Sequence, residues 1–161
     1  MILLGKKRIE RTLKRMAYQI LEEAQNSNII LIGLNERGFA VANMIRTYLG
    51  EAVGSDISLE KLEAYDDSTP NINTEHADDS MLVIVDDVIF SGETMFRAIR
   101  KIPELSTFKK ILVTVMVDRG HRKYPILAGI VGMDVPTKLN EQVEMRLTDN
   151  QPNEVILVQK Q

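Results

Sequence analysis

Two adjacent carboxylates, Asp86 and Asp87, follow the apolar run "MLVIV" at residues 81–85. A turn of small residues within "VIFSGET", residues 88–94, comes directly after them. In an open α/β sheet the ligand binds outside the carboxyl ends of the strands, which is where this pair would lie. Two adjacent like charges repel each other unless a bound partner offsets the repulsion. The pair therefore predicts a ligand-binding site.

The turn behind the pair has the features of a phosphate site. Its backbone N–H groups, together with the positive end of the helix that follows, can bind an anion. Ser91 and Thr94 add hydroxyl donors, and Gly92 lets the backbone approach a ligand closely. A sugar phosphate uses both halves of the window, because its hydroxyls donate to the carboxylates while its phosphate lies in the turn.

A chance acidic pair, a receiver domain and a P-loop each fit this window less well. An acidic pair can stand at the end of a strand by chance, but chance does not supply the turn behind it. A receiver domain also begins with an apolar run and two acids, yet there the pair closes the first strand, and here at least two elements precede it. A P-loop needs Lys directly after its last Gly, where this chain has Glu93.

The elements that must position these residues follow from the spacing of apolar side chains. Residues 7–25 repeat them at three- and four-residue steps and predict an amphipathic helix. "NIILIGL", residues 28–34, predicts a buried strand, and residues 36–50 predict a second helix that ends at Gly50. Residues 56–63 fit either a strand or a helical turn. Residues 64–80 are rich in Asp, Asn, Ser, Thr and Pro and predict a mobile loop.

The second half repeats the same alternation before it changes character. The segments are a strand at 81–85, a helix at 92–102, a strand at 109–117, and three shorter β segments at 127–135, 141–147 and 154–159. Alternating strands and helices predict an α/β fold with a central, mostly parallel sheet and helices on both faces. We expect a single domain over residues 1–161, with a small β extension at about 126–159.

Composition and charge narrow the function classes. The chain has 161 residues, 44% of them hydrophobic, and no Cys, which excludes disulfides and thiolate metal sites. No apolar run approaches the roughly 18 residues of a membrane span, and no signal peptide is visible, so a cytoplasmic location is expected. Residues 1–15 carry six basic side chains against Glu10, whereas residues 56–87 carry ten acidic ones against Lys61. The acidic segment would repel a polyanion.

Two stretches resemble one family. "VIVDDVIFSGET", residues 83–94, resembles the phosphoribosyl pyrophosphate (PRPP) signature of the type I phosphoribosyltransferases. "VMVDRGHRKYPILAGIVGMDVPT", residues 115–137, is similar to a segment of the pyrimidine operon attenuation regulators, members that also have uracil phosphoribosyltransferase activity. The resemblance extends loosely from the first helix to about Leu147. It implies the type I phosphoribosyltransferase fold, with a small β-rich hood.

The resemblance also implies a reaction and its residues. Phosphoribose would pass from PRPP to a nucleobase, with uracil as the expected base. Pyrophosphate would be released through a transition state of oxocarbenium character. Asp86 and Asp87 would hold the ribose hydroxyls and stabilise the developing positive charge. The predicted 5′-phosphate contacts are Ile89, Phe90, Ser91, Gly92, Glu93 and Thr94, and the predicted pyrophosphate loop is Asn35, Glu36, Arg37 and Gly38.

The base and the metal are assigned on the same grounds. Asp118 and Arg119 would face the base, and Ile130 and Val131 would form part of the hood over it. Mg²⁺ would have no direct protein ligand and would arrive chelated by pyrophosphate and ribose oxygens. His121 receives no catalytic role. Members of this kind are usually homodimers or homotetramers, and that is the assembly the resemblance implies.

Several positions depart from the family pattern. Glu93 stands where the regulators have a basic residue, and Ile130 replaces an aromatic. The flexible catalytic loop is shortened, and the family's "YRDD" corresponds either to residues 64–67 or to residues 60–63, with Lys61 in place of Arg. These departures favour an alternative: a catalytically weak regulator that senses PRPP or a nucleotide.

The regulator alternative includes RNA binding, which requires a clustered basic face. Tyr18 and Leu127 stand where the regulators have basic-patch residues, so the resemblance implies that this chain lacks two of those. The candidate RNA contacts are Lys6, Lys7, Arg8, Arg11, Lys14, Arg15, Arg119, Arg122 and Lys123.

Overall fold

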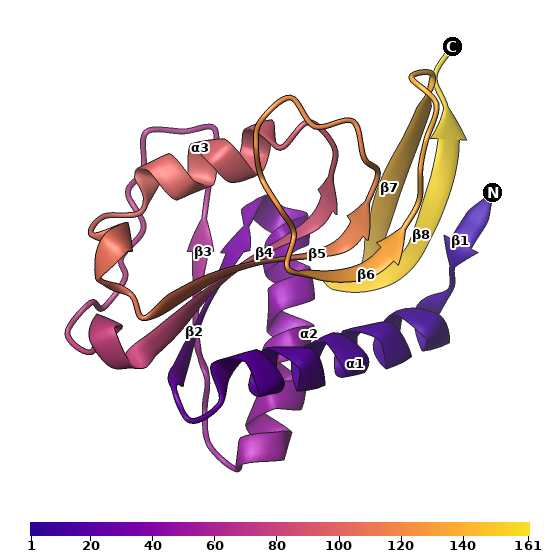
Figure 1. Ribbon diagram of the computed structural model, residues 1–161. Coiled ribbons are helices and arrows are strands. Elements are labelled where there is room, and N and C mark those ends of the chain that lie inside the picture. Colours follow the sequence, from indigo (N-terminus) through magenta and orange to yellow (C-terminus); the bar gives the residue numbers. More distant parts are fainter.

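A five-stranded parallel sheet forms the centre of the molecule in a computed structural model that describes residues 1–161 (Figure 1). Its strands lie in the order β3-β2-β4-β5-β6. Their bounds are β2 Asn28–Leu34, β3 Ser58–Leu62, β4 Ser80–Ile89, β5 Lys110–Asp118 and β6 Ile130–Asp134. The predicted α/β class with a central parallel sheet is confirmed.

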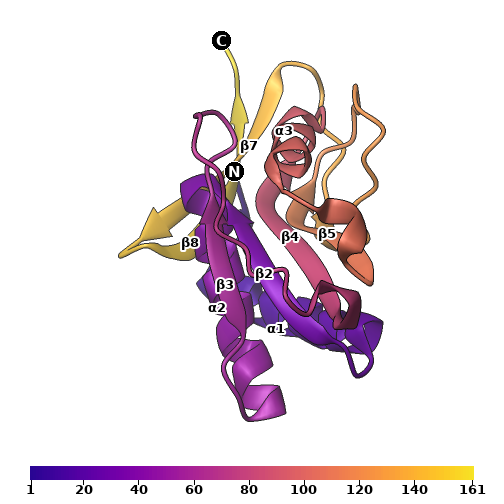
Figure 2. The ribbon, with the colours of Figure 1, turned by 90° about the vertical axis from the view of Figure 1, so that its left-hand side faces the viewer.

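Helices cover both faces of this sheet, as Figures 1 and 2 show. The helices α1 (Lys6–Ala24) and α2 (Asn35–Val53) lie on one face, and α3 (Glu93–Lys101) lies on the other. The alternation of strand side chains explains the two layers. In β4, Val83 packs with the α1 and α2 side chains, whereas its neighbours Leu82 and Ile84 pack with α3.

A second, antiparallel sheet lies at the end of the molecule where both termini are found (Figure 1). It has the order β1-β8-β7, with β1 Ile2–Leu4, β7 Glu141–Thr148 and β8 Gln151–Gln159. Its inner residues Val143, Met145 and Val155 belong to the same core cluster as α1 and α2. The two remaining elements are short 3-10 turns, η1 Ala77–Asp79 and η2 Leu105–Thr107.

The structure moves two predicted boundaries and decides one open alternative. The second helix does not end at Gly50 but continues to Val53, because the N–H of Gly54, at φ +72°, bonds back to the carbonyl of Gly50 and forms the C-cap there. The ambiguous residues 56–63 contain the strand β3. The strand β4 does not end before the acids but runs through them to Ile89.

The β extension also begins later than predicted. The segment around Ile130 pairs in parallel with β5 and completes the central sheet, so of the three predicted β segments of the extension only β7 and β8 lie outside that sheet. The third strand of the outer sheet is β1, whose three residues are too few for a periodic signal. No helix in the structure has the length and apolar character needed to cross a membrane.

The chain reverses its direction across the sheet between β2 and β4. From β2 the chain crosses through α2 to β3 on one side, and from β4 it crosses through α3 to β5 on the other. The helices that leave these two neighbouring strands therefore cover opposite faces and separate at the carboxyl end. Such a switch point leaves a crevice, which is where open α/β sheets bind ligands.

Candidate active site

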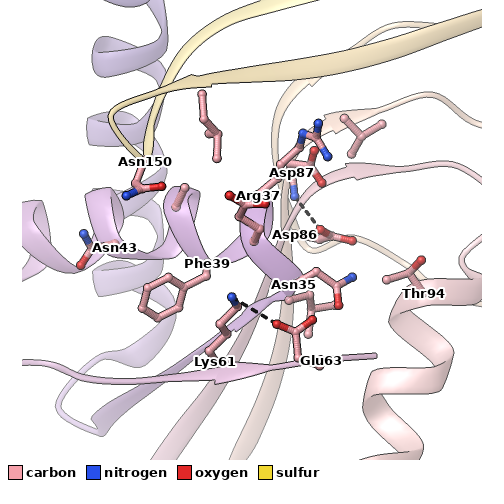
Figure 3. Close-up of a pocket in the computed structure, with 15 residues that line it drawn as sticks. Asn35, Arg37, Phe39, Asn43, Lys61, Glu63, Asp86, Asp87, Thr94 and Asn150 are labelled. Atoms are coloured by element: carbon pink, nitrogen blue, oxygen red, sulfur yellow. Dashed lines mark hydrogen bonds and ion pairs between the residues drawn. The ribbon is translucent and has the colours of Figure 1, made fainter. Parts of the chain in front are cut away.

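A cleft of about 790 Å³ opens at this switch point (Figure 3). The end of β2, the start of α2 and the end of β4 supply most of its walls, and the turn between β7 and β8 closes one side. Of the predicted site residues, Asn35, Glu36, Arg37, Asp86, Asp87 and Thr94 line it. Residues 35–37 and 86–87, about 50 positions apart in the chain, are thus brought together where the sheet reverses its winding.

The turn that starts α2 is fixed to its surroundings on three sides. Asn35 has a left-handed backbone, at φ +57°, and its side-chain oxygen accepts a hydrogen bond from the N–H of Ala64 at 2.9 Å. Arg37 donates from Nε to the carbonyl of Met145 in β7 at 2.8 Å. At Gly38 a Cβ would lie 2.9 Å from the carbonyl oxygen of Val85, so only Gly allows this close approach to β4.

The two acidic residues at the end of β4, Asp86 and Asp87, lie in different environments, since Asp86 is the more buried of the two. Asp86 is 6% exposed, and its Oδ1 accepts a hydrogen bond from the backbone N–H of Asp87 at 2.9 Å. Burial, and after it the neighbouring charge of Asp87, raise the pKa of Asp86 well above its ordinary value. A ligand that donates hydrogen bonds or brings positive charge would relieve both effects, as expected of a site for hydroxyl groups.

A second cavity of about 200 Å³ adjoins the cleft and contains the predicted phosphate turn. All six predicted residues, Ile89 to Thr94, line it together with Asp86, Val88, Tyr65 and Met95. Gly92 adopts φ +87°, which turns the chain from β4 into α3 and which other residues rarely adopt. Asp86 and Thr94 belong to the walls of both cavities, so one ligand can extend from one into the other.

The segment after β5 holds this turn in place. The carbonyl of Ser91 accepts hydrogen bonds from the N–H groups of Lys123 and Tyr124 at 2.9 and 3.0 Å. Arg122 donates to the carbonyl of Phe90 at 2.9 Å and pairs with Asp118 at 2.7 Å. The turn is therefore positioned by protein contacts before any ligand arrives, which lowers the cost of ordering it on binding.

Glu93, the acidic departure in the turn, is paired along the helix. Its carboxylate lies 3.6 Å from a guanidinium nitrogen of Arg97, one helical turn further on, with both side chains half exposed. A free carboxylate about 5 Å from a bound phosphate would cost about 3 kcal/mol at an effective dielectric of 20. The charge of Arg97 offsets part of this repulsion, so Glu93 does not by itself exclude a phosphate.

Comparison with known proteins decides the family. Residues 2–146 match the family model described as phosphoribosyl transferase domain, which is most of the chain. The chain belongs to the phosphoribosyltransferase family. It is 31% identical over 159 residues to the bifunctional protein PyrR of Streptococcus suis, covering 93% of this chain and 91% of that protein. It is 34% identical over 158 residues to the bifunctional protein PyrR of Haemophilus ducreyi, covering 90% and 88%.

Solved structures agree on the fold. A hypoxanthine-guanine phosphoribosyltransferase from Bacillus anthracis superposes with a TM-score of 0.74 at 18% identity, covering 98% of this chain and 96% of that one. The hypoxanthine phosphoribosyltransferase of Trypanosoma cruzi gives 0.72 at 15% identity, covering 99% and 97%. The predictions of the phosphoribosyltransferase family, of its fold and of this class of transferase are confirmed.

Four residues were predicted to contact the base: Asp118, Arg119, Ile130 and Val131. None of them belongs to the walls of either cavity of this phosphoribosyltransferase. Ile130 is 3% exposed and packs in the core, so its side chain does not face the cleft, and Val131 is partly buried on the α3 side. Arg119 is 6% exposed; it lies 4.1 Å from the centre of the Phe90 ring and donates to Thr137 at 3.1 Å. Their contact with a base stays a prediction.

Asp118 is likewise engaged within the protein. Burial raises the pKa of its carboxyl, but hydrogen bonds from Arg122 and from the N–H of Gly120 outweigh burial and leave the pKa below its ordinary value. His121 bonds through Nε2 to the carbonyl of Thr137 at 2.6 Å and meets the edge of the Phe90 ring. Both residues thus help to hold the phosphate turn.

Several further residues line the cleft, and among those named next only the stretch 60–63 was considered from the sequence, as one alternative for the family's "YRDD". Lys61 and Glu63 of the β3 end form a 3.1 Å ion pair at the margin of the cleft, shown in Figure 3 below Asn35 and Asp86. Two stretches were alternatives for the family's "YRDD". Of these, residues 60–63 contribute to the cleft, because the side chain of Lys61 lines it. Leu147 lies near the end of β7, Asn150 lies in the turn that follows it, and Phe39 and Asn43 come from α2. No local pattern marks these four.

Proposed function

We propose that this phosphoribosyltransferase transfers phosphoribose from PRPP to uracil and releases pyrophosphate, as a step of pyrimidine salvage. The observation that carries the proposal is the meeting of a buried acidic pair and a pre-positioned phosphate turn at the switch point, with Asp86 and Thr94 shared by both cavities. The choice of uracil rests on the resemblance of residues 115–137 to the attenuation regulators.

The two cavities divide the substrate between them. The 5′-phosphate fits the smaller cavity, where Ser91, Thr94 and the N-terminus of α3 supply donors. The pyrophosphate group fits the start of α2, where Arg37 and Lys61 supply positive charge and the helix N-terminus adds its own. The ribose then lies between them, over Asp86 and Asp87.

The acidic pair has a role in the transition state. As the bond to pyrophosphate breaks, positive charge develops on the ribose ring. Asp87 is partly exposed in the cleft and Asp86 lies buried beside it, so both carboxyl groups are already positioned beside the ribose before the reaction begins. The same carboxylates accept hydrogen bonds from the ribose hydroxyls and fix the sugar relative to the base.

Mg²⁺ fits the chemistry of this donor set. The carboxyl groups of Asp86 and Asp87 line the cleft and offer hard oxygen atoms of the kind that attract this ion. No group of three His, Asp or Glu side chains lies close enough to hold a metal ion, so we expect its direct ligands to be oxygens of PRPP. When bound, the ion would neutralise charge on the leaving pyrophosphate.

A base panel tests the proposal. Purified protein is incubated with PRPP, Mg²⁺ and, in separate reactions, labelled uracil, hypoxanthine, guanine or orotate, and nucleotide formation is measured. We expect turnover with uracil, and a loss of about a hundredfold or more in the variants Asp86→Asn and Asp87→Asn. Turnover with a purine alone would refute the choice of base, and no turnover with any base would refute the enzyme.

A second candidate function, RNA binding by a regulator of pyrimidine genes, is favoured by one surface. All six basic side chains of the first 15 residues are exposed, and none takes part in an ion pair. They are Lys6, Lys7, Arg8, Arg11, Lys14 and Arg15. The other predicted basic cluster does not form a free surface, because Arg119 is buried and Arg122 is paired with Asp118. The RNA surface would therefore be α1.

Salt dependence tests this surface. Binding of a pyrimidine-operon leader RNA should weaken as salt rises, and the slope should fall by about one for each phosphate contact that is removed. The double variant Lys7→Glu, Lys14→Glu should lower the affinity without changing uracil turnover. Binding that does not respond to salt would refute RNA recognition by α1.

The resemblance further supports a cytoplasmic location and a homodimeric or homotetrameric assembly. Sedimentation measures the assembly directly.

A further inference from the structure

Tyr65 reaches the phosphate turn from a different part of the chain. Its phenol oxygen lies 2.7 Å from Oγ1 of Thr94, and its side chain forms part of the wall of the smaller cavity. The guanidinium of Arg97 stacks over its ring at 4.9 Å. Tyr65 nevertheless remains 59% exposed, so burial of its ring does not account for this position.

The segment that carries Tyr65 is anchored on both sides. The N–H of Ala64 bonds to Asn35 at the start of α2. From α3, Lys101 contacts the carbonyls of Glu63 and Asp66 and pairs with the Asp66 carboxylate at 3.2 Å. Figure 2 shows this segment, which follows β3, beside α3. The first residues of the predicted mobile loop are therefore held between the two phosphate-binding turns.

We propose that Tyr65 is a positioning residue for the 5′-phosphate. Its phenol donates to Thr94, which aims the proton of the Thr94 hydroxyl into the cavity, and its ring closes the cavity wall. The bound group would be the terminal phosphate monoester of a ribose phosphate. This inference rests on the proposed function and assigns to it a residue outside the signature at 83–94.

A purely structural latch at Tyr65 would behave differently from a positioning residue. If Tyr65 only tied the segment to α3, its loss would weaken every ligand of the cleft to a similar extent, because Ala64 bonds to the pyrophosphate turn. If it acts through Thr94, its loss weakens phosphate monoesters and leaves pyrophosphate alone. The cavity, at about 200 Å³, is several times the ~30 Å³ that one water molecule occupies in the liquid, so it has room for such a group.

The experiment measures the affinity of the full chain for ribose 5-phosphate and for Mg²⁺-pyrophosphate by calorimetry. In Tyr65→Phe we expect the affinity for ribose 5-phosphate to fall about five- to tenfold, the size of one hydrogen bond, with pyrophosphate unchanged. Tyr18→Phe, an exposed tyrosine of α1, is the matched control and should leave both unchanged. In kinetics, Tyr65→Phe should raise the KM for PRPP more than it lowers kcat.

A double-mutant cycle with Thr94→Val separates the outcomes. Because Tyr65 acts through Thr94, we expect Tyr65→Phe to have less than about a twofold effect once Thr94 is Val. Equal losses for both ligands, or a full loss in the Thr94→Val background, would overturn the inference. If the unaltered protein binds neither ribose 5-phosphate nor PRPP, the proposed function fails and this inference with it. If it binds both and Tyr65→Phe does so equally well, the inference alone fails.

Discussion

Gly38→Ala tests whether the close approach of α2 to β4 is needed for activity. The added Cβ would lie 2.9 Å from the carbonyl of Val85 and 3.0 Å from Oδ1 of Asp86, whereas ordinary contacts begin at 3.4 Å. The start of α2 must therefore move by 3.4 − 2.9, about 0.5 Å, away from the acidic pair. Since a misplacement of about 1 Å costs on the order of a hundredfold in rate, half of it predicts about a tenfold fall in kcat/KM.

The stability of this variant should change only modestly. Ala is a better helix former than Gly by about 1 kcal/mol, which offsets part of the roughly 1–3 kcal/mol that overpacking costs. We expect the free energy of unfolding to fall by no more than about 2 kcal/mol in a denaturant titration. Gly5→Ala is the control, because no atom lies within 4 Å of its Cβ. A Gly38→Ala protein that is more stable and fully active would refute the reasoning.

Two further predictions concern charges around the site. Burial and the charge of Asp87 raise the pKa of Asp86 in the folded protein. The folded protein therefore keeps a proton that the unfolded chain releases at about pH 4. As a result, the stability of the protein falls as pH rises from about 4 through the folded pKa of Asp86. Asp86→Asn removes this fall, so in thermal unfolding the variant should gain stability relative to the unaltered protein as pH rises from about 4 through the folded pKa of Asp86. A difference that stays constant with pH would contradict this. Arg122→Gln removes a 2.7 Å ion pair and the bond to Phe90, and should lower the free energy of unfolding by about 1–3 kcal/mol and raise the KM for PRPP. An unchanged KM would show that this anchor is not needed.

The sequence predicted the parts of the site that lie close together in the chain. The acidic pair and the phosphate turn belong to one window, because a strand, its end and the following helix N-terminus are consecutive. The turn at Asn35 was added because the stretch after the first strand resembles the pyrophosphate loop of the family. Parallel strands with helical crossovers place such ends at one edge of the sheet.

The parts that the sequence did not predict depend on tertiary contacts. Leu147 and Asn150 line the cleft only because β7 and β8 fold back over α2, and nothing local indicates that position. Ile130 was assigned to the base from its place in a resembling segment, but its side chain faces the core because β6 joins the central sheet. Tyr65 lay in a stretch of loop composition, and its contact with Thr94 requires the three-dimensional path of that segment.

Calorimetric titration with PRPP in the presence of Mg²⁺ tests the central claim most directly, namely that the cleft between β2 and β4 binds a ribose bearing a phosphate and a pyrophosphate. We predict saturable binding to the unaltered protein, and its loss in the double variant Asp86→Asn, Asp87→Asn, which should remain folded. No heat of binding at PRPP concentrations of about 1 mM, or equal binding by the double variant, would contradict the claim.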